Sequence, residues 1–96
     1  MENILNTELA RLIDLLSALQ DKKSFNAYLE KIKNHNTLSY AELKYYLEQI
    51  QEIILSYDDH YIWSEELSAI SKCLLLQDEI EREKNKKIKE EVKRGE

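Results

Sequence analysis

The absence of turn-forming residues constrains this chain more than any other feature. There is no proline, and the one glycine is Gly95. Tight β-hairpins use glycine at their turns, and a sheet protein needs such turns at short intervals. The sequence therefore predicts an all-α fold. The same absence excludes the P-loop, the dinucleotide-binding glycine fingerprint and the nucleophile elbow, since each needs glycine at fixed positions.

Apolar residues recur at spacings of four and three along two long segments, which is the pattern of one buried helix face. A first helix is expected over residues 3–21, and a third is expected to begin at a capping box of Ser39 and Glu42. Between them, Ser24 would cap a short helix that ends at residues 34–37. The apolar stripes of the three helices are Leu5, Leu9, Leu12, Leu16 and Leu19; Phe25, Leu29 and Ile32; and Tyr40, Leu43, Leu47, Ile50, Ile54 and Tyr57.

A fourth helix is expected to begin at Asp58 or Asp59, whose carboxylate would cap it, with Ser64 as the alternative start. Two apolar rows widen its buried face as far as Ile80. Residues 81–96 then hold seven basic and five acidic residues in sixteen, and opposite charges four residues apart support an exposed helix. We expect an antiparallel bundle of about four helices, one of them short, with a bundle domain over residues 1–80 and a charged helical extension over 81–96. The two rows are Trp63, Leu67, Ile70 and Leu74, and Ala69, Cys73, Leu76 and Ile80.

The size and charge of the chain limit its partners. Ninety-six residues fit one domain with one core. The net charge is −5, and because residues 81–96 carry +2, residues 1–80 carry −7. An acidic body disfavours binding to nucleic acid, whose phosphates supply most of the affinity. No apolar run reaches the roughly 20 residues of a membrane span, and the start does not resemble a signal peptide. We therefore expect a cytoplasmic protein that binds neither nucleic acid nor membrane.

The sequence offers only weak candidates for a catalytic or metal-binding site. Asp58, Asp59 and His60 are consecutive, and no second cluster completes a coordination sphere. Cys73 lies among apolar residues of a helix face, where a structural cysteine is typical. As the only cysteine, it cannot form an internal disulfide. We expect no enzyme activity, no catalytic residue, no metal, no cofactor and no small-molecule substrate.

The stretch SYDDHYIWSEE, residues 56–66, crowds three aromatic residues and four carboxylates together. Tyr57 and Trp63 are expected to anchor two helices to the core. Tyrosine and tryptophan also bury a large area at low entropic cost, so they suit a protein-binding surface. The predicted partner-binding residues are Tyr45, Tyr61, Glu65 and Glu66.

Three functional hypotheses follow. In size, acidity and helix content the chain is similar to small bacterial accessory proteins such as secretion chaperones and immunity proteins, a similarity that extends to no motif. The first hypothesis is a chaperone or adaptor that shields a partner segment or forms a homodimer through apolar helix faces. The alternative is an inhibitor or immunity protein whose acidic, tyrosine-rich face neutralises a basic toxin or nuclease. The third is a DNA-associated regulator.

Overall fold

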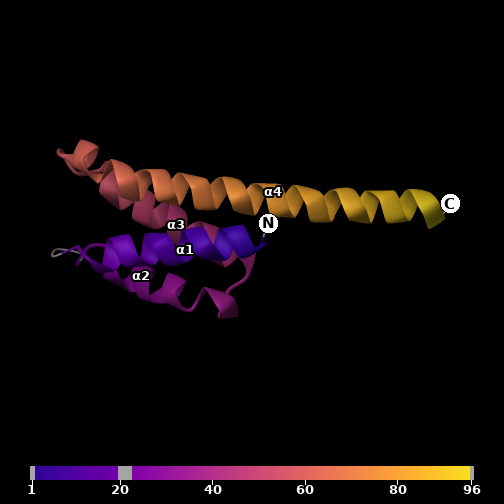
Figure 1. The fold of residues 1–96 in the computed structure, drawn as a ribbon, viewed down its shortest axis with the longest axis horizontal. Helices are drawn as coiled ribbons and strands as arrows, with labels where there is room; N and C mark the ends of the chain where they lie inside the picture. The colour runs from indigo at the N-terminus through magenta and orange to yellow at the C-terminus, as the bar shows by residue number, and fades with distance from the viewer. Residues whose placement is uncertain (1, 20–22, 96) are drawn as a thin grey trace.

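The protein is a helical bundle in which one helix is far longer than the others (Figure 1). The computed structural model describes the backbone of residues 2–19 and 23–95, and the side chains of residues 3–19 and 23–85. No strand occurs in these parts of the chain, so the predicted all-α fold is confirmed. The elements are α1 (Glu2–Ser17), α2 (Asn26–Lys33), the 3-10 turn η1 (His35–Thr37), α3 (Tyr40–Leu55), the 3-10 turn η2 (His60–Trp63) and α4 (Ser64–Gly95).

Successive helices run antiparallel, as the sequence predicts (Figure 1). α1 packs against α4 and α2, and α3 packs against the same two helices from the other side. The four helices therefore enclose a single core. The described chain measures 56 × 25 × 19 Å, and the long dimension follows α4.

The core is built from the predicted stripes. Each of the four leucines that α1 contributes is at most 3% exposed. The stripes of α2 and α3 are buried against them, and each fully buried leucine or isoleucine stabilises the fold by about 1.5–3 kcal/mol. The buried stripe residues of α1, α2 with its N-cap, and α3 are Leu5, Leu9, Leu12 and Leu16; Phe25, Leu29 and Ile32; and Leu43, Leu47, Ile50 and Ile54.

The predicted caps are right for α3 and wrong for α2. At α3, the Glu42 backbone N–H donates to Ser39 Oγ and the Ser39 N–H donates to Glu42 Oε1, both at 3.2 Å. At α2, Phe25 rather than Ser24 takes the N-cap position, and no side chain caps the helix. Phe25 is fully buried, so its packing sets where the helix begins and outweighs the missing cap.

α1 ends earlier than the sequence predicts. Its last helical residue is Ser17, not residue 21. The Leu19 N–H donates to the Leu16 carbonyl at 3.3 Å, a bond that spans three residues and tightens the last turn. Leu19 packs half-buried against the core. Residues 20–22, where the sequence places the end of the helix, lie outside the described residues.

α4 also differs from prediction. It begins at Ser64, the alternative start, and Asp59 makes no side-chain capping bond, so the predicted cap at Asp58 or Asp59 is wrong. The 3-10 turn η2 occupies the four residues before the helix and carries the chain into it. The buried face lies between the two predicted rows, because α4 packs against both α1 and α3. Its buried residues are Ala69, Ile70, Cys73, Gln77 and Ile80.

α4 is twice as long as the helices beside it. It has 32 residues against 16 in both α1 and α3, which is about 48 Å against about 24 Å. Its C-terminal half extends beyond the bundle (Figure 1). The division between residues 1–80 and 81–96 falls inside this helix and stays a prediction. The ion pairs expected after residue 85 lie outside the described side chains.

The capping box of α3 gives a direct stability test. Ser39→Ala removes the acceptor for the Glu42 N–H, so unfolding in urea should show a loss of about 0.5–2 kcal/mol. Ser68→Ala, at an exposed position inside α4, is the control and should lose nothing. Equal stability of the Ser39 variant and the unsubstituted protein would mean that the box does not hold the start of α3.

Candidate protein-binding surface

The turn between α3 and α4 is formed by local hydrogen bonds. After α3 ends, the Ser56 hydroxyl donates to the Ile53 carbonyl at 2.6 Å, and the Tyr57 N–H donates to the Ile54 carbonyl. The Tyr57 carbonyl then accepts the His60 N–H at 3.2 Å and lies 2.8 Å from the His60 ring nitrogen Nδ1. No described non-glycine residue has a positive φ. The turn therefore needs no left-handed backbone conformation, which is the conformation that would favour glycine.

Trp63 anchors this turn to the bundle. Its ring meets Phe25 edge-to-face, with centroids 6.3 Å apart and planes at 88°, and it lies 5.5 Å from the Tyr57 ring. The first contact ties η2 to the start of α2, and the second ties it to the residues that follow α3. This geometry agrees with the anchoring role predicted for Tyr57 and Trp63. The indole Nε1 is buried without an acceptor among the described residues.

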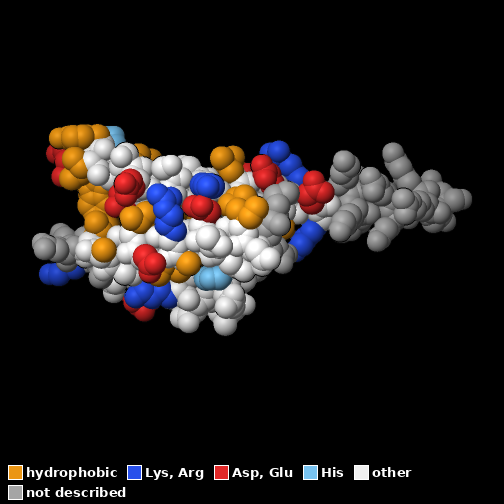
Figure 2. All heavy atoms as spheres, viewed as in Figure 1, with side chains coloured by type: hydrophobic (Ala, Val, Ile, Leu, Met, Phe, Trp, Pro, Cys, Tyr) orange, Lys and Arg blue, Asp and Glu red, His pale blue; other side chains and the backbone are white. Residues whose placement is uncertain are grey.

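The same turn leaves two large apolar side chains in solvent. Tyr61 is 73% exposed and Ile62 is 63% exposed, although both adjoin the anchored Trp63. Acidic residues flank them on either side in the chain. Figure 2 shows apolar side chains gathered at this end of the molecule with acidic ones beside them. We call this surface the acidic corner, defined as Asp58, Asp59, Tyr61, Ile62, Glu65 and the half-buried Glu66.

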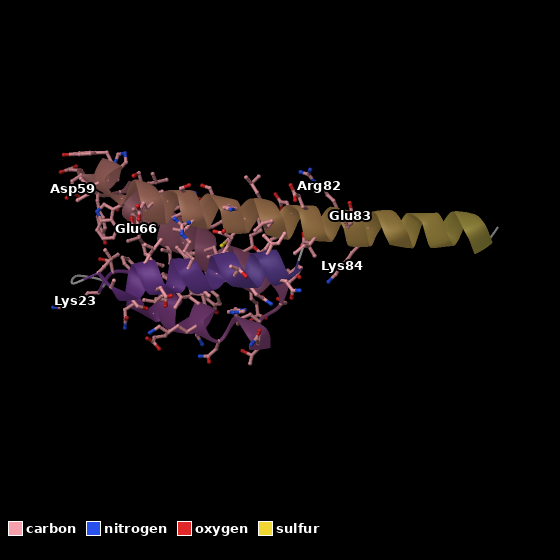
Figure 3. All side chains as sticks on the ribbon, in the orientation of Figure 1. Lys23, Asp59, Glu66, Arg82, Glu83 and Lys84 are labelled. Carbon is pink, nitrogen blue, oxygen red and sulfur yellow. The ribbon has the colours of Figure 1, made fainter. Side chains whose placement is uncertain are left out.

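The acidic corner has a strong local charge. Residues 56–66 include four carboxylates and neither lysine nor arginine. Lys23, on the connection between α1 and α2, lies at the same end of the molecule, below Asp59 and Glu66 in the view of Figure 3. The electrostatic potential at the corner is therefore negative, with a cation at its border. Such a surface attracts a basic partner.

Tyr45 lies elsewhere, on the face formed by α2 and α3. It is 53% exposed, and its ring centroid is 5.5 Å from that of Tyr46 and 6.5 Å from that of Tyr28. Tyr28 and Tyr46 pack against the core, so Tyr45 widens an aromatic cluster. The structure thus brings together Tyr61, Glu65 and Glu66 but not Tyr45. A binding role for any of the four stays a prediction.

The surroundings of Cys73 agree with the structural role that the sequence predicts for it. Its side chain is fully buried. Burial raises the pKa of the thiol to about 12; the nearby negative charge of Glu8 adds to the increase, and the positive charge of Lys72 opposes it. A nucleophilic cysteine needs the opposite shift, because the thiolate is the reactive form. Among the described residues, no group of three or more His, Cys, Asp or Glu is arranged to hold a metal ion.

Polar contacts between helices were not predicted from the sequence. Lys72 on α4 pairs with Glu8 on α1 at 3.0 Å. Gln77, only 2% exposed, donates from Nε2 to the Tyr40 carbonyl at 3.2 Å and so ties α4 to the start of α3. Its Oε1 has no partner in the described part of the chain. Glutamine is usually exposed, and no local pattern marks one that reaches a neighbouring helix.

Comparison with known proteins adds no identification. No protein-family model matches the chain, and neither the curated proteins nor the solved structures include a significant match. Over the described residues, no helix has both the length and the apolar composition needed to cross a membrane. The function must therefore be inferred from the chain's own residues.

Neighbouring aromatic residues of η2 should differ in their effects on stability. Trp63→Ala removes the ring that meets both Phe25 and Tyr57, and should lower the free energy of unfolding by about 3–5 kcal/mol. Tyr61→Ala changes an exposed ring and should stay within about 0.5 kcal/mol. Thermal and urea unfolding measure both. A loss at Tyr61 as large as that at Trp63 would show that the whole turn is structural.

The raised pKa of Cys73 predicts a pH dependence. The ordinary thiol pKa is 9.0 and the folded value is about 12, so between these values the unfolded chain loses a proton that the folded chain keeps. This proton release favours unfolding and removes stability as the pH rises, by at most about 1.4 kcal/mol per pH unit. The Cys73→Ala protein lacks this titration. Its deficit relative to the unsubstituted protein should therefore shrink between about pH 9 and about pH 11 in urea unfolding. A deficit that stays constant with pH would contradict the burial of the thiol.

Proposed function

We propose that the protein is a non-enzymatic binding protein that docks a basic protein partner on the acidic corner, in the manner of an inhibitor or immunity protein. The observation that carries the proposal is the exposure of Tyr61 and Ile62 beside a half-buried anchor, Trp63. An exposed aromatic–aliphatic pair in a rim of four carboxylates suits the anchor of a protein interface.

Two physical arguments support this surface. The anchoring of Trp63 to Phe25 and the local hydrogen bonds fix the backbone of η2, so little ordering entropy is lost on binding. The carboxylates attract a positively charged partner, raise the association rate and repel acidic proteins. Apolar contact then supplies affinity and charge supplies selectivity.

The chaperone or adaptor hypothesis has less support. It requires an apolar helix face that is open to a partner or to a second copy of the chain. The apolar stripes of α1 and α3 are buried inside the bundle. The other exposed large apolar residues include Ile4 and Leu75, on separate helices, and single exposed apolar residues are common on any protein.

Affinity capture on immobilised protein tests the proposal. The matched variants are Tyr61→Ala combined with Ile62→Ser, and Leu75→Ser as a control of similar exposure on α4. A specific basic partner from the source organism should bind the unsubstituted protein and the control, and should be lost with the double variant. Binding should also weaken in about 0.5 M salt, where charge attraction is screened within a few ångströms.

Two outcomes would contradict the proposal. The first is that the double variant still captures the partner, while circular dichroism shows that the variant itself is normally folded. The second is capture that the Leu75 variant loses and salt leaves unchanged, which would favour an adaptor that uses a helix face. Light scattering at high concentration distinguishes that case further, because a homodimer through α4 has twice the monomer mass of 11.4 kDa.

A further inference from the structure

The four carboxylates of the acidic corner form no ion pair with a described residue. Elsewhere in the described chain, ion pairs involve the carboxylates of Glu8, Glu30 and Glu48. Neither these pairs nor the side-chain hydrogen bonds among described residues include a carboxylate of the corner. A partner's cation can therefore bind these carboxylates without displacing a described cation of the chain, which removes one cost of association.

The backbone of the turn places two of these carboxylates beside the exposed apolar side chains. The His60 N–H donates to the carbonyl three residues before it at 3.2 Å, and the Ile62 N–H donates to the Asp59 carbonyl at 3.1 Å. Bonds that span three residues wind the chain at about three residues per turn, so side chains three apart lie on the same side. Asp58 therefore lies on the same side of the turn as Tyr61, and Asp59 on the same side as Ile62.

Tyr61 presents an open ring beside these charges. Its side chain is 73% exposed. The rings of Tyr57 and Trp63 lie 5.5 Å apart, whereas the Tyr61 ring makes no ring–ring or cation–π contact with a described residue. An aromatic face attracts a cation that lies within about 6 Å of the ring centroid. The Tyr61 ring is therefore available to a cation of the partner.

A ring with a carboxylate on the same side distinguishes between the two cationic side chains of proteins. The guanidinium of arginine is planar, so it stacks on an aromatic ring and also donates two parallel hydrogen bonds to one carboxylate. The ammonium of lysine is a compact and strongly hydrated point charge that lacks this paired geometry. The arrangement of Asp58 and Tyr61 therefore favours arginine.

We infer that the basic partner presents an arginine to the acidic corner, with its guanidinium over the Tyr61 ring and two of its N–H groups donating to the Asp58 carboxylate. Ile62 then contacts an apolar part of the same partner segment. This inference rests on the proposed function and names the cation that the corner selects. The corner of a second copy does not suit this role, because four carboxylates would face four others.

Two capped heptapeptides of equal charge test the inference. One alternates serine with arginine, the other alternates serine with lysine, and each has three cations. Each is titrated into isotope-labelled full-length protein in dilute buffer, and NMR follows the backbone amide signals of Asp58, Tyr61 and Ile62. The arginine peptide should give saturable shifts at these residues with a Kd on the order of millimolar. The lysine peptide should bind about fivefold more weakly.

A matched pair of tyrosine variants tests the ring. Tyr61→Leu keeps an apolar side chain and removes the aromatic face, so the preference for the arginine peptide should fall below about twofold. Tyr45→Leu removes a tyrosine that is 53% exposed on the face formed by α2 and α3, so the full preference should remain. Both side chains are exposed, so both variants should fold.

A matched pair of carboxylate variants tests the paired hydrogen bonds. Asp58→Asn and Glu65→Gln each remove one negative charge of the corner and keep the size of the side chain. Asp58→Asn should weaken the arginine peptide more than the lysine peptide, because it removes the acceptor of both parallel bonds. Glu65→Gln should weaken the two peptides by the same factor, since it changes only the attraction between charges.

The outcomes separate this inference from the proposed function. Equal affinity of the two peptides, or a preference that Tyr61→Leu leaves unchanged, would overturn the arginine contact but leave docking of a basic partner on the corner intact. Equal weakening of both peptides by Asp58→Asn would also overturn it. Absence of saturable shifts with either peptide would overturn it too, and the capture experiment would then test the proposed function separately. A preference lost with Tyr61→Leu and kept with Tyr45→Leu supports the contact.

Discussion

The burial of one face of α4 against both α1 and α3 is the contact on which the rest of the structure depends. α1 and α4 form the most extensive helix contact in the described chain, and α3 covers the other side of the same face. Cys73 and Ile70, both fully buried, lie on that face. Because α4 has twice the residues of its neighbours, this packing covers only its first half. The second half extends past the bundle (Figure 1).

This arrangement makes the two ends of the bundle chemically different. At one end the chain turns from α3 into α4, and the anchoring of Trp63 leaves Tyr61 and Ile62 in solvent among carboxylates. At the other end no such turn joins α4 to its neighbours, and a cavity remains beside Lys84 where the helix leaves.

The fold was predictable from the sequence because it depends on short-range patterns. Leucine spacing marks the buried face of α1, and Ser39 with Glu42 marks the start of α3, since both signals lie within a few residues of the structure they specify. The start of α2 was not predictable in this way, because Phe25 is placed by packing against Trp63, distant in the chain. The preferred start of α4 at Asp58 or Asp59 was wrong and the alternative, Ser64, was right, since a 3-10 turn replaced the expected carboxylate cap.

The candidate site was predictable in part. The composition of residues 56–66 predicted Tyr61 as a partner-binding residue, and in the structure its side chain is exposed. Tyr45 is also an exposed tyrosine, yet it joins the cluster with Tyr28 on another face. The cavity at the opposite end was not predictable, because its walls come from four separate segments. Local patterns do not reveal which distant segments meet.

Site-specific photo-crosslinking tests the central claim most directly. A benzophenone amino acid is placed at position 61, at position 45 or at position 75, three exposed sites on different parts of the surface. The cells of the source organism are then irradiated. The account predicts that one basic protein cross-links from position 61 and from neither of the other two. Cross-links to the same protein from position 45 or position 75 but not from position 61 would contradict it.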